Sequence, residues 1–361
     1  MSNFKSRRFS ECDVNDPFFN GLKEDYDDFT GWFSRKSTAG ESAYVCFDDG
    51  IQAFLYLKEN EDEEIPGVLP KERRIKIGTL KISEGSQEQR LGEGAMGIAL
   101  WRWQQSDVMS IYVTVLPKHE RLIRFLQLFG FVYTGMKEKE EAVYLKDKRK
   151  LDYGTAKLSF PYLNPNLSRG KYIPINDDFH DKLFQYSELK NVKRDPEEDA
   201  LAASNGLCKV YIATPSNDID YCPGDIAIIY RKHTGEGPKK YKSVATSFCT
   251  IQKQTPIKTA MKYVKSQVEF NSIVGNKSVY SKEELDGIYR NASTKNLIVI
   301  EMIYNGFFGA GHNVTYDALD KEDLFNEHPY KIQLTREDVL KIIKMGGKRE
   351  QDIIIDQPGA C

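Results

Sequence analysis

Six consecutive residues of this sequence have the types and spacing needed to bind an anionic group. They are Gln89, Arg90, Leu91, Gly92, Glu93 and Gly94. The two glycines allow backbone N–H groups to approach a ligand closely, and a helix beginning there would add the positive end of its dipole. The spacing is neither that of a P-loop nor that of a dinucleotide loop. The alternative interpretation is a turn in which the glycines serve only the backbone geometry.

The flanking residues predict a strand before this hexapeptide and a helix after it. Residues 74–82 are rich in β-favouring apolar side chains, with a break in register around Gly78. Apolar residues then recur at helical spacing from Met96 to Trp103, and a second strand is expected over 109–115. The order strand, turn, helix, strand therefore places the hexapeptide at the start of a helix.

The composition limits the classes of protein to consider. A chain of 361 residues is long for one domain and sufficient for two. An apolar fraction of 40% with 12% aromatic residues is enough to form buried cores, which excludes a disordered chain. The net charge is −2, from 51 basic and 53 acidic residues. Neither half has a basic excess, so nucleic-acid binding would need a local patch.

The cysteines and the N-terminal residues indicate the compartment. The six cysteines form no Cys-x-x-Cys pair and have no suitably spaced histidine, so no metal site is expected. Cys46 and Cys249 occur in strand-like settings, as expected of buried side chains in a reducing cytosol. There is no signal peptide and no apolar span of about 18 residues. We expect a cytoplasmic protein that does not enter a membrane.

The first half predicts a definite order of elements around the hexapeptide. A helical stripe of aromatic residues over 16–33 comes first, and a hairpin with an Asp-Gly turn over 42–58 follows. After the strand, turn, helix and strand described above, a helix over 120–129 and two strands, over 131–135 and 142–146, complete the order.

This order, with Gln-x-x-Gly-x-Gly before one helix and Gly130-Phe131 after the last, resembles the GNAT superfamily of N-acetyltransferases. The resemblance covers residues from about 8 to 150 and implies an α/β GNAT fold, a mixed central sheet flanked by helices, in a domain over 1–150. It also implies acetyl-CoA as co-substrate, without a metal, and transfer of the acetyl group to an amine. By analogy, backbone N–H groups of the hexapeptide would bind the pyrophosphate.

The same resemblance implies which residues hold the rest of acetyl-CoA. In the family, the strand before the loop pairs with the pantetheine arm, and the matching residues here are Leu80, Lys81 and Ile82. A backbone N–H of Leu80 or Lys81 would polarise the thioester carbonyl as an oxyanion donor. The acetyl cleft would form where this strand splays from residues 112–115.

The resemblance leaves the catalytic acid and base open. Many family members have a tyrosine four residues before the glycine of the Gly-Phe pair, but here that position is Leu126. Tyr112 and Tyr133 are the substitutes expected from their positions, and a core or rim role is the alternative interpretation for each. The central strand has no glutamate, so the base would be Glu59 or water, or there would be none.

The second half is predicted to be mainly β after a linker with short helices over 151–204. An apolar strand preceded by Pro223-Gly224-Asp225, followed by a basic insertion and a returning strand, resembles ASCH and related PUA-like β-barrels. The resemblance covers about 205–310. It implies a β-barrel with helices, in a domain over 205–361, that recognises RNA or a modified nucleobase. Helices are expected over 178–184, 196–205, 258–269, 281–290 and 334–343.

A basic loop in this half is consistent with nucleic-acid binding. Its positive residues are Arg231, Lys232, Lys239, Lys240 and Lys242. Tyr230 and Tyr241 lie beside them, so phosphate-binding charge is combined with rings on which bases can stack. A solvated hairpin loop is the alternative interpretation.

Three functions remain open from the sequence. The first is acetyl-CoA-dependent N-acetyl transfer, with the barrel presenting RNA or a nucleotide-bearing acceptor such as an aminoacyl-tRNA. The second is an RNA-binding regulator whose GNAT half senses acyl-CoA without turnover. The third is acetylation of a protein or a small amine, with the barrel as a docking module.

Overall fold

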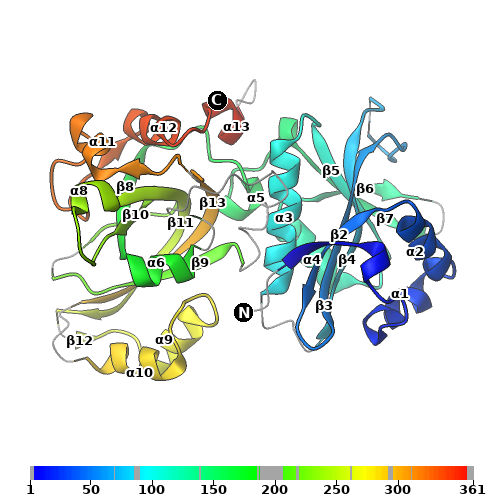
Figure 1. Ribbon diagram of the computed structural model, residues 1–361, viewed down its shortest axis with the longest axis horizontal. Coiled ribbons are helices and arrows are strands. Elements are labelled where there is room, and N and C mark those ends of the chain that lie inside the picture. The colour runs from blue at the N-terminus through cyan, green and yellow to red at the C-terminus, as the bar shows by residue number, and fades with distance from the viewer. Residues whose placement is uncertain are drawn as a thin grey trace. The chain divides into compact units, whose positions relative to one another are not determined.

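A computed structural model of the protein describes residues 4–68, 70–84, 90–137, 140–184, 187, 206–216, 219–260, 262–291, 296–309 and 311–355. The chain divides into two compact units (Figure 1). The first contains Met1–Leu151 and Arg194–Gly206, and the second contains Asp152–Lys193 and Leu207–Cys361. Each unit has a mixed β-sheet of its own.

The first unit has a seven-stranded sheet in the order β1-β2-β3-β4-β5-β7-β6. All neighbours are antiparallel except β4 and β5, which run parallel. A parallel pair needs a crossover connection, which helix α3 (Leu91–Gln105) provides. The strands are β1 (Phe4–Arg8), β2 (Ser42–Phe47), β3 (Ile51–Glu61), β4 (Arg74–Ile82), β5 (Ser110–Val115), β6 (Val132–Met136) and β7 (Ala142–Asp147).

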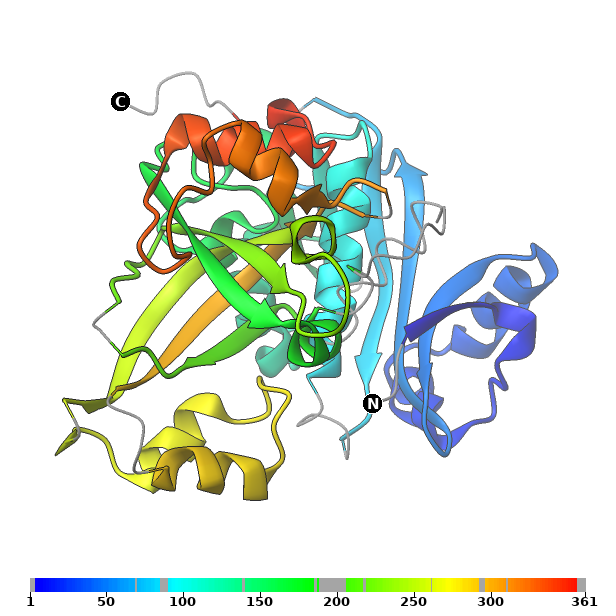
Figure 2. The ribbon, with the colours of Figure 1, turned by 60° about the vertical axis from the view of Figure 1, so that its left-hand side comes forward.

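Helices cover both faces of this sheet (Figures 1 and 2). Helix α3 packs against β3, β4 and β5 and buries Met96 and Trp103. On the other face, α1 and α2 cover an aromatic cluster that includes Phe9, Phe33 and Phe54. The helices and 3-10 turns besides α3 are η1 (Phe9–Glu11), η2 (Pro17–Phe19), α1 (Asn20–Asp25), α2 (Phe29–Thr38), α4 (Glu120–Leu128) and η5 (Lys148–Lys150).

The predicted helix over 16–33 is divided into η2, α1 and α2. The Asp16 carboxylate accepts a hydrogen bond from the Phe18 N–H and starts η2. Tyr26 has extended backbone angles and ends α1, and α2 begins only after Asp28. The aromatic stripe is therefore buried as predicted, but by three short elements rather than one.

The predicted break in register at Gly78 is confirmed as a β-bulge. In the pairing of β3 with β4, Tyr56 faces Thr79 and Leu57 faces Ile77, which leaves Gly78 without a partner in the register. A Cβ added at Gly78 would lie 2.7 Å from the ring of Tyr56. Only glycine therefore fits at the bulge without displacing that ring.

The second unit has an eight-stranded sheet with the main path β15-β8-β10-β11-β13-β9, and β12 and β14 also pair with β11. Strands β8 and β10 run parallel, and the other pairs are antiparallel. This path has two ends, so the described strands do not close into the predicted barrel. The strands are β8 (Arg169–Asn176), β9 (Cys208–Ala213), β10 (Ile226–Lys232), β11 (Val244–Thr259), β12 (Lys262–Tyr263), β13 (Leu297–Phe307), β14 (Val314–Thr315) and β15 (Leu334–Thr335).

Two apolar clusters hold the second unit together. One includes Tyr172, Phe248 and Val339, and the other includes Phe270 and Leu285, which join α9 to α10 (Figure 2). Within the described residues, no helix is both long and apolar enough to cross a membrane. The helices are α5 (Ala156–Ser159), α6 (Asp177–Leu183), α8 (Lys239–Lys242), α9 (Gln267–Val274), α10 (Lys282–Arg290), α11 (Tyr316–Lys321), α12 (Arg336–Met345) and α13 (Glu350–Ile353).

One predicted helix of the second half is wrong. Residues 258–269 do not form a helix, because β11 continues to Thr259 with Ile257 buried and Lys258 paired with Leu297. Helix α9 starts only after Ser266, where Ser266 and Glu269 form a capping box.

The other expectations for this half have mixed outcomes. The helices over 178–184, 281–290 and 334–343 are confirmed as α6, α10 and α12, the last two starting with capping boxes. The helix over 196–205 lies outside the described residues. Arg169–Asn176, which falls within the predicted linker, forms strand β8 of the sheet.

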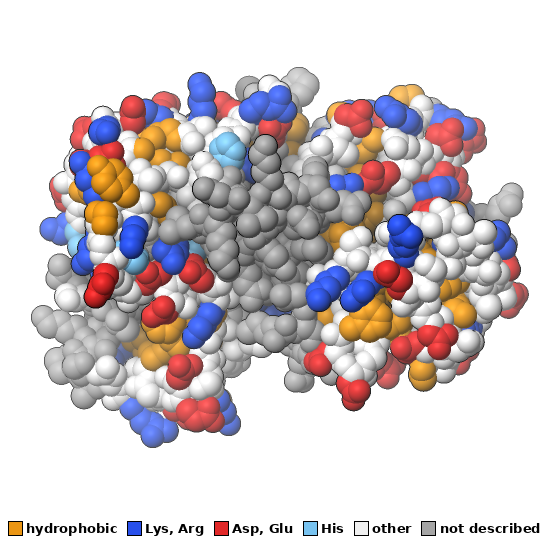
Figure 3. Space-filling view, in the orientation of Figure 1, with side chains coloured by type: hydrophobic (Ala, Val, Ile, Leu, Met, Phe, Trp, Pro, Cys, Tyr) orange, Lys and Arg blue, Asp and Glu red, His pale blue; other side chains and the backbone are white. Residues whose placement is uncertain are grey.

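Charges of both signs are interspersed among the described residues on one face of the molecule. On the face shown in Figure 3, the described Lys and Arg side chains alternate with Asp and Glu side chains. This distribution fits a chain with 51 basic and 53 acidic residues.

Candidate active site in the first unit

Strands β4 and β5 separate partway along their length. They pair in parallel from Ile75 with Ile111 to Ile77 with Val113, and none of the described residues of β5 pairs with β4 beyond that point. Strand β4 nevertheless continues to Ile82. The bulge at Gly78 lies where the pairing ends. The separation leaves one backbone edge of β4 open to a ligand.

One hydrogen bond shows which N–H groups face this open edge. The Ser83 N–H donates to the Gln52 carbonyl of β3, with an N···O distance of 2.9 Å. Because successive N–H groups of a strand point to opposite sides, Lys81 also directs its N–H towards β3. The N–H groups of Leu80 and Ile82 point to the side that β5 has left. Of the two predicted oxyanion donors, Leu80 has the suitable direction.

Helix α3 begins within the predicted anion-binding hexapeptide. Arg90 caps it with a left-handed φ of 61°, and Gln89 lies outside the described residues. The Gly94 N–H donates to the Arg90 carbonyl at 3.1 Å, so the helix itself uses this group. The N–H groups of Leu91 and Gly92, in the first turn, have no acceptor within the helix. These two groups are therefore the ones suited to an anion.

The side chains at the helix start leave space for a ligand beside Gly92. A Cβ added at Gly92 would meet only the ring of Phe125, at 3.8 Å. The Arg90 guanidinium forms an ion pair with Glu93 at 2.6 Å. A phosphate bound here would therefore compete with Glu93 for Arg90, which limits the contribution of that side chain.

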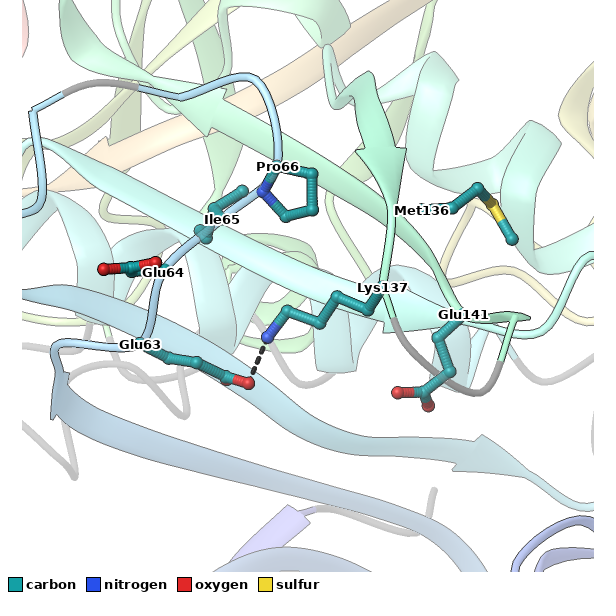
Figure 4. A pocket seen from close by; sticks show the side chains of 7 residues that line it. All are labelled: Glu63, Glu64, Ile65, Pro66, Met136, Lys137 and Glu141. Carbon is teal, nitrogen blue, oxygen red and sulfur yellow. Dashed lines mark ion pairs between the residues drawn. The ribbon is translucent and has the colours of Figure 1, made fainter.

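Glu63, which follows β3, is surrounded by donors on the face of the sheet opposite α3. It accepts hydrogen bonds from the Tyr112 hydroxyl at 2.9 Å and from Lys76 at 3.2 Å, and Lys137 forms an ion pair with it (Figure 4). Burial alone would raise the pKa of Glu63, but the hydrogen bond from Lys137 and the charge of Lys76 outweigh it and lower the pKa to about 2. Glu63 is therefore an ion-paired carboxylate and a poor base.

A second carboxylate, Glu141, precedes β7 and lies at the strand separation. It accepts hydrogen bonds from the Tyr26 hydroxyl at 3.1 Å and the Thr114 hydroxyl at 3.4 Å. Thr114 directly follows Val113, the last β5 residue that pairs with β4. Among the described residues, no Lys or Arg forms an ion pair with Glu141. Its carboxylate is thus a charged group at the mouth of the open strand edge.

Sequence reasoning missed Glu141 and Tyr26. Strand alternation places Thr114 on the same face as Tyr112, so the sequence could have indicated Thr114 as a polar residue of the site. Tyr26, however, lies between α1 and α2, and no local pattern connects it with a glutamate that precedes β7. Only the tertiary fold brings the two together.

A cavity of about 520 Å³ adjoins both carboxylates (Figure 4). In Figure 4 the Lys137 ammonium group faces Glu63, and the carboxylate of Glu141 points towards the side of the view on which Glu63 lies. The cavity is lined by Glu63, Glu64, Ile65, Pro66, Met136, Lys137 and Glu141. It therefore combines acidic groups with an apolar part of the wall.

The three residues predicted to be catalytic have different environments. Tyr112 is buried with its hydroxyl bound to Glu63, and burial and that hydrogen bond raise its pKa. Tyr133 is half exposed on the edge strand β6. Glu59 is bound by Arg102 of α3 at 2.5 Å. The catalytic roles of these three residues stay predictions. The carboxylate that the fold brings to the strand separation is that of Glu141.

In the second unit, the predicted nucleic-acid-binding residue Arg231 is anchored to α6. It donates two hydrogen bonds, each of 2.8 Å, to the carboxylate of Asp181. Only 12% of its side chain is exposed. This arginine therefore holds the helix on β10 and offers little of its charge to a phosphate.

The four predicted lysines of the same loop differ in their partners. Lys240 forms an ion pair with Asp317 at 2.7 Å, and Lys242 donates to a backbone carbonyl at 2.8 Å. Lys232 and Lys239 are exposed, and no described residue binds either side chain. The basic loop thus has two lysines available to an anion rather than five cations.

Comparisons with known proteins give structural likenesses alone. No protein-family model matches this chain, and no curated protein matches it in sequence. An acetyltransferase of the GNAT family from Staphylococcus aureus is similar to it with a TM-score of 0.31 and 11% identity, over 41% of this chain and 99% of that chain. The N-acetyltransferase YlbP of Bacillus subtilis, in complex with coenzyme A, is similar with a TM-score of 0.28 and 11% identity, over 40% and 96%.

A mutant of the ZmASCH protein from Zymomonas mobilis is also similar, with a TM-score of 0.30 and 12% identity, over 49% of this chain and 95% of that chain. Structures of both families that the sequence resembles, GNAT and ASCH, thus occur among the similar ones. TM-scores near 0.3 carry no conclusion about activity. The function has to be inferred from the residues of this chain.

Proposed function

We propose that the first unit is an acetyl-CoA-dependent N-acetyltransferase. The observation that carries this proposal is the separation of β4 from β5 at the Gly78 bulge. Because α3 follows β4 in the crossover, its N-terminus lies near the carboxyl end of the same strand, where ligands of parallel strands bind. The open strand edge and the helix N-terminus therefore lie next to each other. A long ligand could pair its amide groups with the strand edge and place its phosphate groups at the helix N-terminus.

Each part of acetyl-CoA has a matching group in this arrangement. The pantetheine amides would pair with the open edge of β4 as an added strand does, through the backbone of Leu80 and Ile82. The pyrophosphate would accept hydrogen bonds from the N–H groups of Leu91 and Gly92, with the dipole of α3 favouring its charge. The Leu80 N–H would polarise the thioester carbonyl.

The reaction itself needs a free amine at the separation of the strands. The amine nitrogen forms a bond to the thioester carbonyl carbon, and the carbon–sulfur bond breaks. The products are the N-acetyl amide and the thiol of coenzyme A, with release of one proton when the acceptor enters as an ammonium ion. A carboxylate beside the cleft is suited to take up that proton.

Replacing Gly92 by valine tests the donor site. A side chain at this position has room within the protein, but in a helix it leans towards the N-terminus, where the pyrophosphate would bind. We expect the dissociation constant of acetyl-CoA to rise at least about ten-fold, or about 1.4 kcal/mol. Isothermal titration calorimetry on the full chain measures it.

The matched control is Gly287→Val, because Gly287 lies in α10 and an added Cβ there would meet no atom within 4 Å. This variant should bind acetyl-CoA as tightly as the wild type. Absence of measurable acetyl-CoA affinity in the wild-type protein would exclude the proposed function. Equal affinity in the Gly92→Val variant would show that the pyrophosphate binds elsewhere.

A further inference from the structure

We infer that the acceptor is a cationic amine attached to an apolar group, and that Glu141 binds its ammonium ion and takes up its proton. This inference rests on the proposed function and names the acceptor class of the same site. It follows from the charge of the cavity wall, from the hydrogen bonds of Glu63 and Glu141, and from the packing of the apolar part of the wall.

The wall of the cavity is acidic on balance. The described residues that line it include three glutamates and one lysine, an excess of two negative charges, or of one when Lys76, which pairs with Glu63, is also counted. Lys137, the lysine among these described residues, is paired with Glu63 and is not available to an anionic ligand. Such a wall attracts an ammonium ion and repels a phosphate or a carboxylate.

The two glutamates nearest the strand separation differ in how many acceptor atoms remain available to a ligand. Glu63 is neutralised by Lys76 and Lys137. Glu141 accepts both of its hydrogen bonds, from Tyr26 and Thr114, on Oε1. Its Oε2 accepts no hydrogen bond from the described residues, so it can receive one from an ammonium group. The two hydroxyls fix the orientation of the carboxylate meanwhile.

The apolar part of the wall combines a loop packed on β6 with the exposed side chain of Met136. Ile65 and Pro66 lie in the loop after β3, and Met136 ends β6. A Cβ added at Gly67 would lie 2.6 Å from the Thr134 carbonyl, and one added at Gly135 would lie 2.7 Å from Pro66. The loop therefore packs closely on β6 and places Ile65 and Pro66 along the wall, which suits a ligand with an apolar body.

The proton transfer balances with these groups. The ammonium ion gives one proton to Oε2 of Glu141, and the resulting amine attacks the thioester carbonyl carbon. The carbon–nitrogen bond forms, the carbon–sulfur bond breaks, and the sulfur leaves as the thiol with the second proton of the nitrogen. Glu141 then releases its proton to water.

Two probes of equal shape test the acceptor class on the full-length protein. L-Phenylalaninamide and L-phenylalanine carry the same ring and amine, but only the second adds a carboxylate. We expect acetyl-CoA-dependent acetylation of the amide with a kcat/KM at least about ten-fold higher, since the extra charge faces an acidic wall. Equal rates, or preference for phenylalanine, would overturn the inference.

The variant Glu141→Gln tests whether Glu141 takes up the proton of the acceptor. Its amide oxygen still accepts from Tyr26 and Thr114, so the fold is preserved, but it cannot take a proton. We expect kcat/KM for phenylalaninamide to fall at least about 100-fold, as for the loss of a general base. The dissociation constant of acetyl-CoA should stay within about two-fold, as Glu141 lies outside the donor groups. A loss of kcat/KM with unchanged acetyl-CoA affinity separates the loss of the proton acceptor from a disturbed fold.

Glu140→Gln is the matched control, because it makes the same charge change one residue away at an exposed side chain. It should acetylate the amide at the wild-type rate. Glu141→Asp keeps the charge and should recover part of the lost activity. A Glu141→Gln variant as active as the wild type would overturn the inference but leave the proposed function intact. A wild-type protein that binds no acetyl-CoA and acetylates no amine would overturn both.

Discussion

The two glutamates beside the cavity show how surroundings assign different roles to one side-chain type. Glu63 is bound by a hydroxyl and two ammonium groups, so its charge is balanced within the protein. Among the residues that the structure describes, only hydroxyl groups bind the Glu141 side chain, so its charge remains for a ligand. At the residue scale, the candidate site therefore consists of one structural ion pair network and one carboxylate able to react.

The first prediction concerns the pH dependence that Glu63 gives to stability. Its pKa is about 2 in the folded protein against an ordinary value of 4.5, so its contribution is present above pH 4.5 and is lost as the pH falls towards 2. Because 40% of the side chain is exposed, screening limits the contribution to about 1 kcal/mol. Urea unfolding at pH 5 and pH 2.5 should show a smaller acid-induced loss in Glu63→Gln than in the wild type. An equal loss would contradict this account of Glu63.

The donor site depends on one irregularity at the scale of elements. The bulge at Gly78 lies where β4 leaves β5, and the alternation of N–H groups beyond it directs Leu80 and Ile82 to the open edge. A regular strand at this position would continue the ladder with β5 and close that edge. The glycine and the ring of Tyr56 pressed against it therefore determine where a ligand can pair.

A second prediction follows for Gly78→Ala. The new Cβ would collide with the Tyr56 ring at 2.7 Å, and overpacking of this kind costs about 1–3 kcal/mol of unfolding free energy. Acetyl-CoA affinity should fall as well, because the bulge moves. Gly306→Ala in β13 is the control, since its Cβ would lie 2.7 Å from the Phe248 ring in the second unit. It should lose similar stability and keep acetyl-CoA affinity. Equal acetyl-CoA affinity in the two variants would show that the bulge does not shape the acetyl-CoA site.

Much of this element order could be predicted from local patterns. The strand before Gly92 and the helix around it, the bulge at Gly78 and the capping boxes at Ser281 and Thr335 all have short-range signals, and all are present. The helix predicted over 258–269 failed because a long central strand is held by its neighbours rather than by its own propensities. The role of Glu141 depends on a contact with Tyr26, for which the sequence has no local signal.

At the scale of the whole molecule, the two units differ in what they offer to a ligand. The first has an open strand edge, a helix start and a cavity with an acidic wall. The second has a basic loop whose arginine is anchored to α6 and whose lysines are partly paired. Its strands, as far as the structure describes them, form an open mixed sheet rather than a barrel.

A third prediction concerns RNA binding by the full chain. With Lys232 and Lys239 as the available cations of the loop, about two counterions are released on binding a single strand. The logarithm of the binding constant should therefore fall with the logarithm of the salt concentration with a slope of about −1.4. Fluorescence anisotropy with a labelled RNA of random sequence measures it. A slope of −3.5 or steeper, as expected for five cations, would show that the paired side chains also bind phosphate.

The central claim is that this chain moves an acetyl group from coenzyme A to a cationic amine. The most direct measurement incubates the purified protein with acetyl-CoA labelled in the acetyl group and with phenylalaninamide, phenylalanine, a mixed peptide pool and RNA in parallel. Mass spectrometry of the products and titration of released thiol are read together. The account predicts labelled amide on the cationic amines, with an equal amount of thiol, and little label on phenylalanine or RNA. Label confined to RNA or to phenylalanine, or no label on any acceptor, would contradict it.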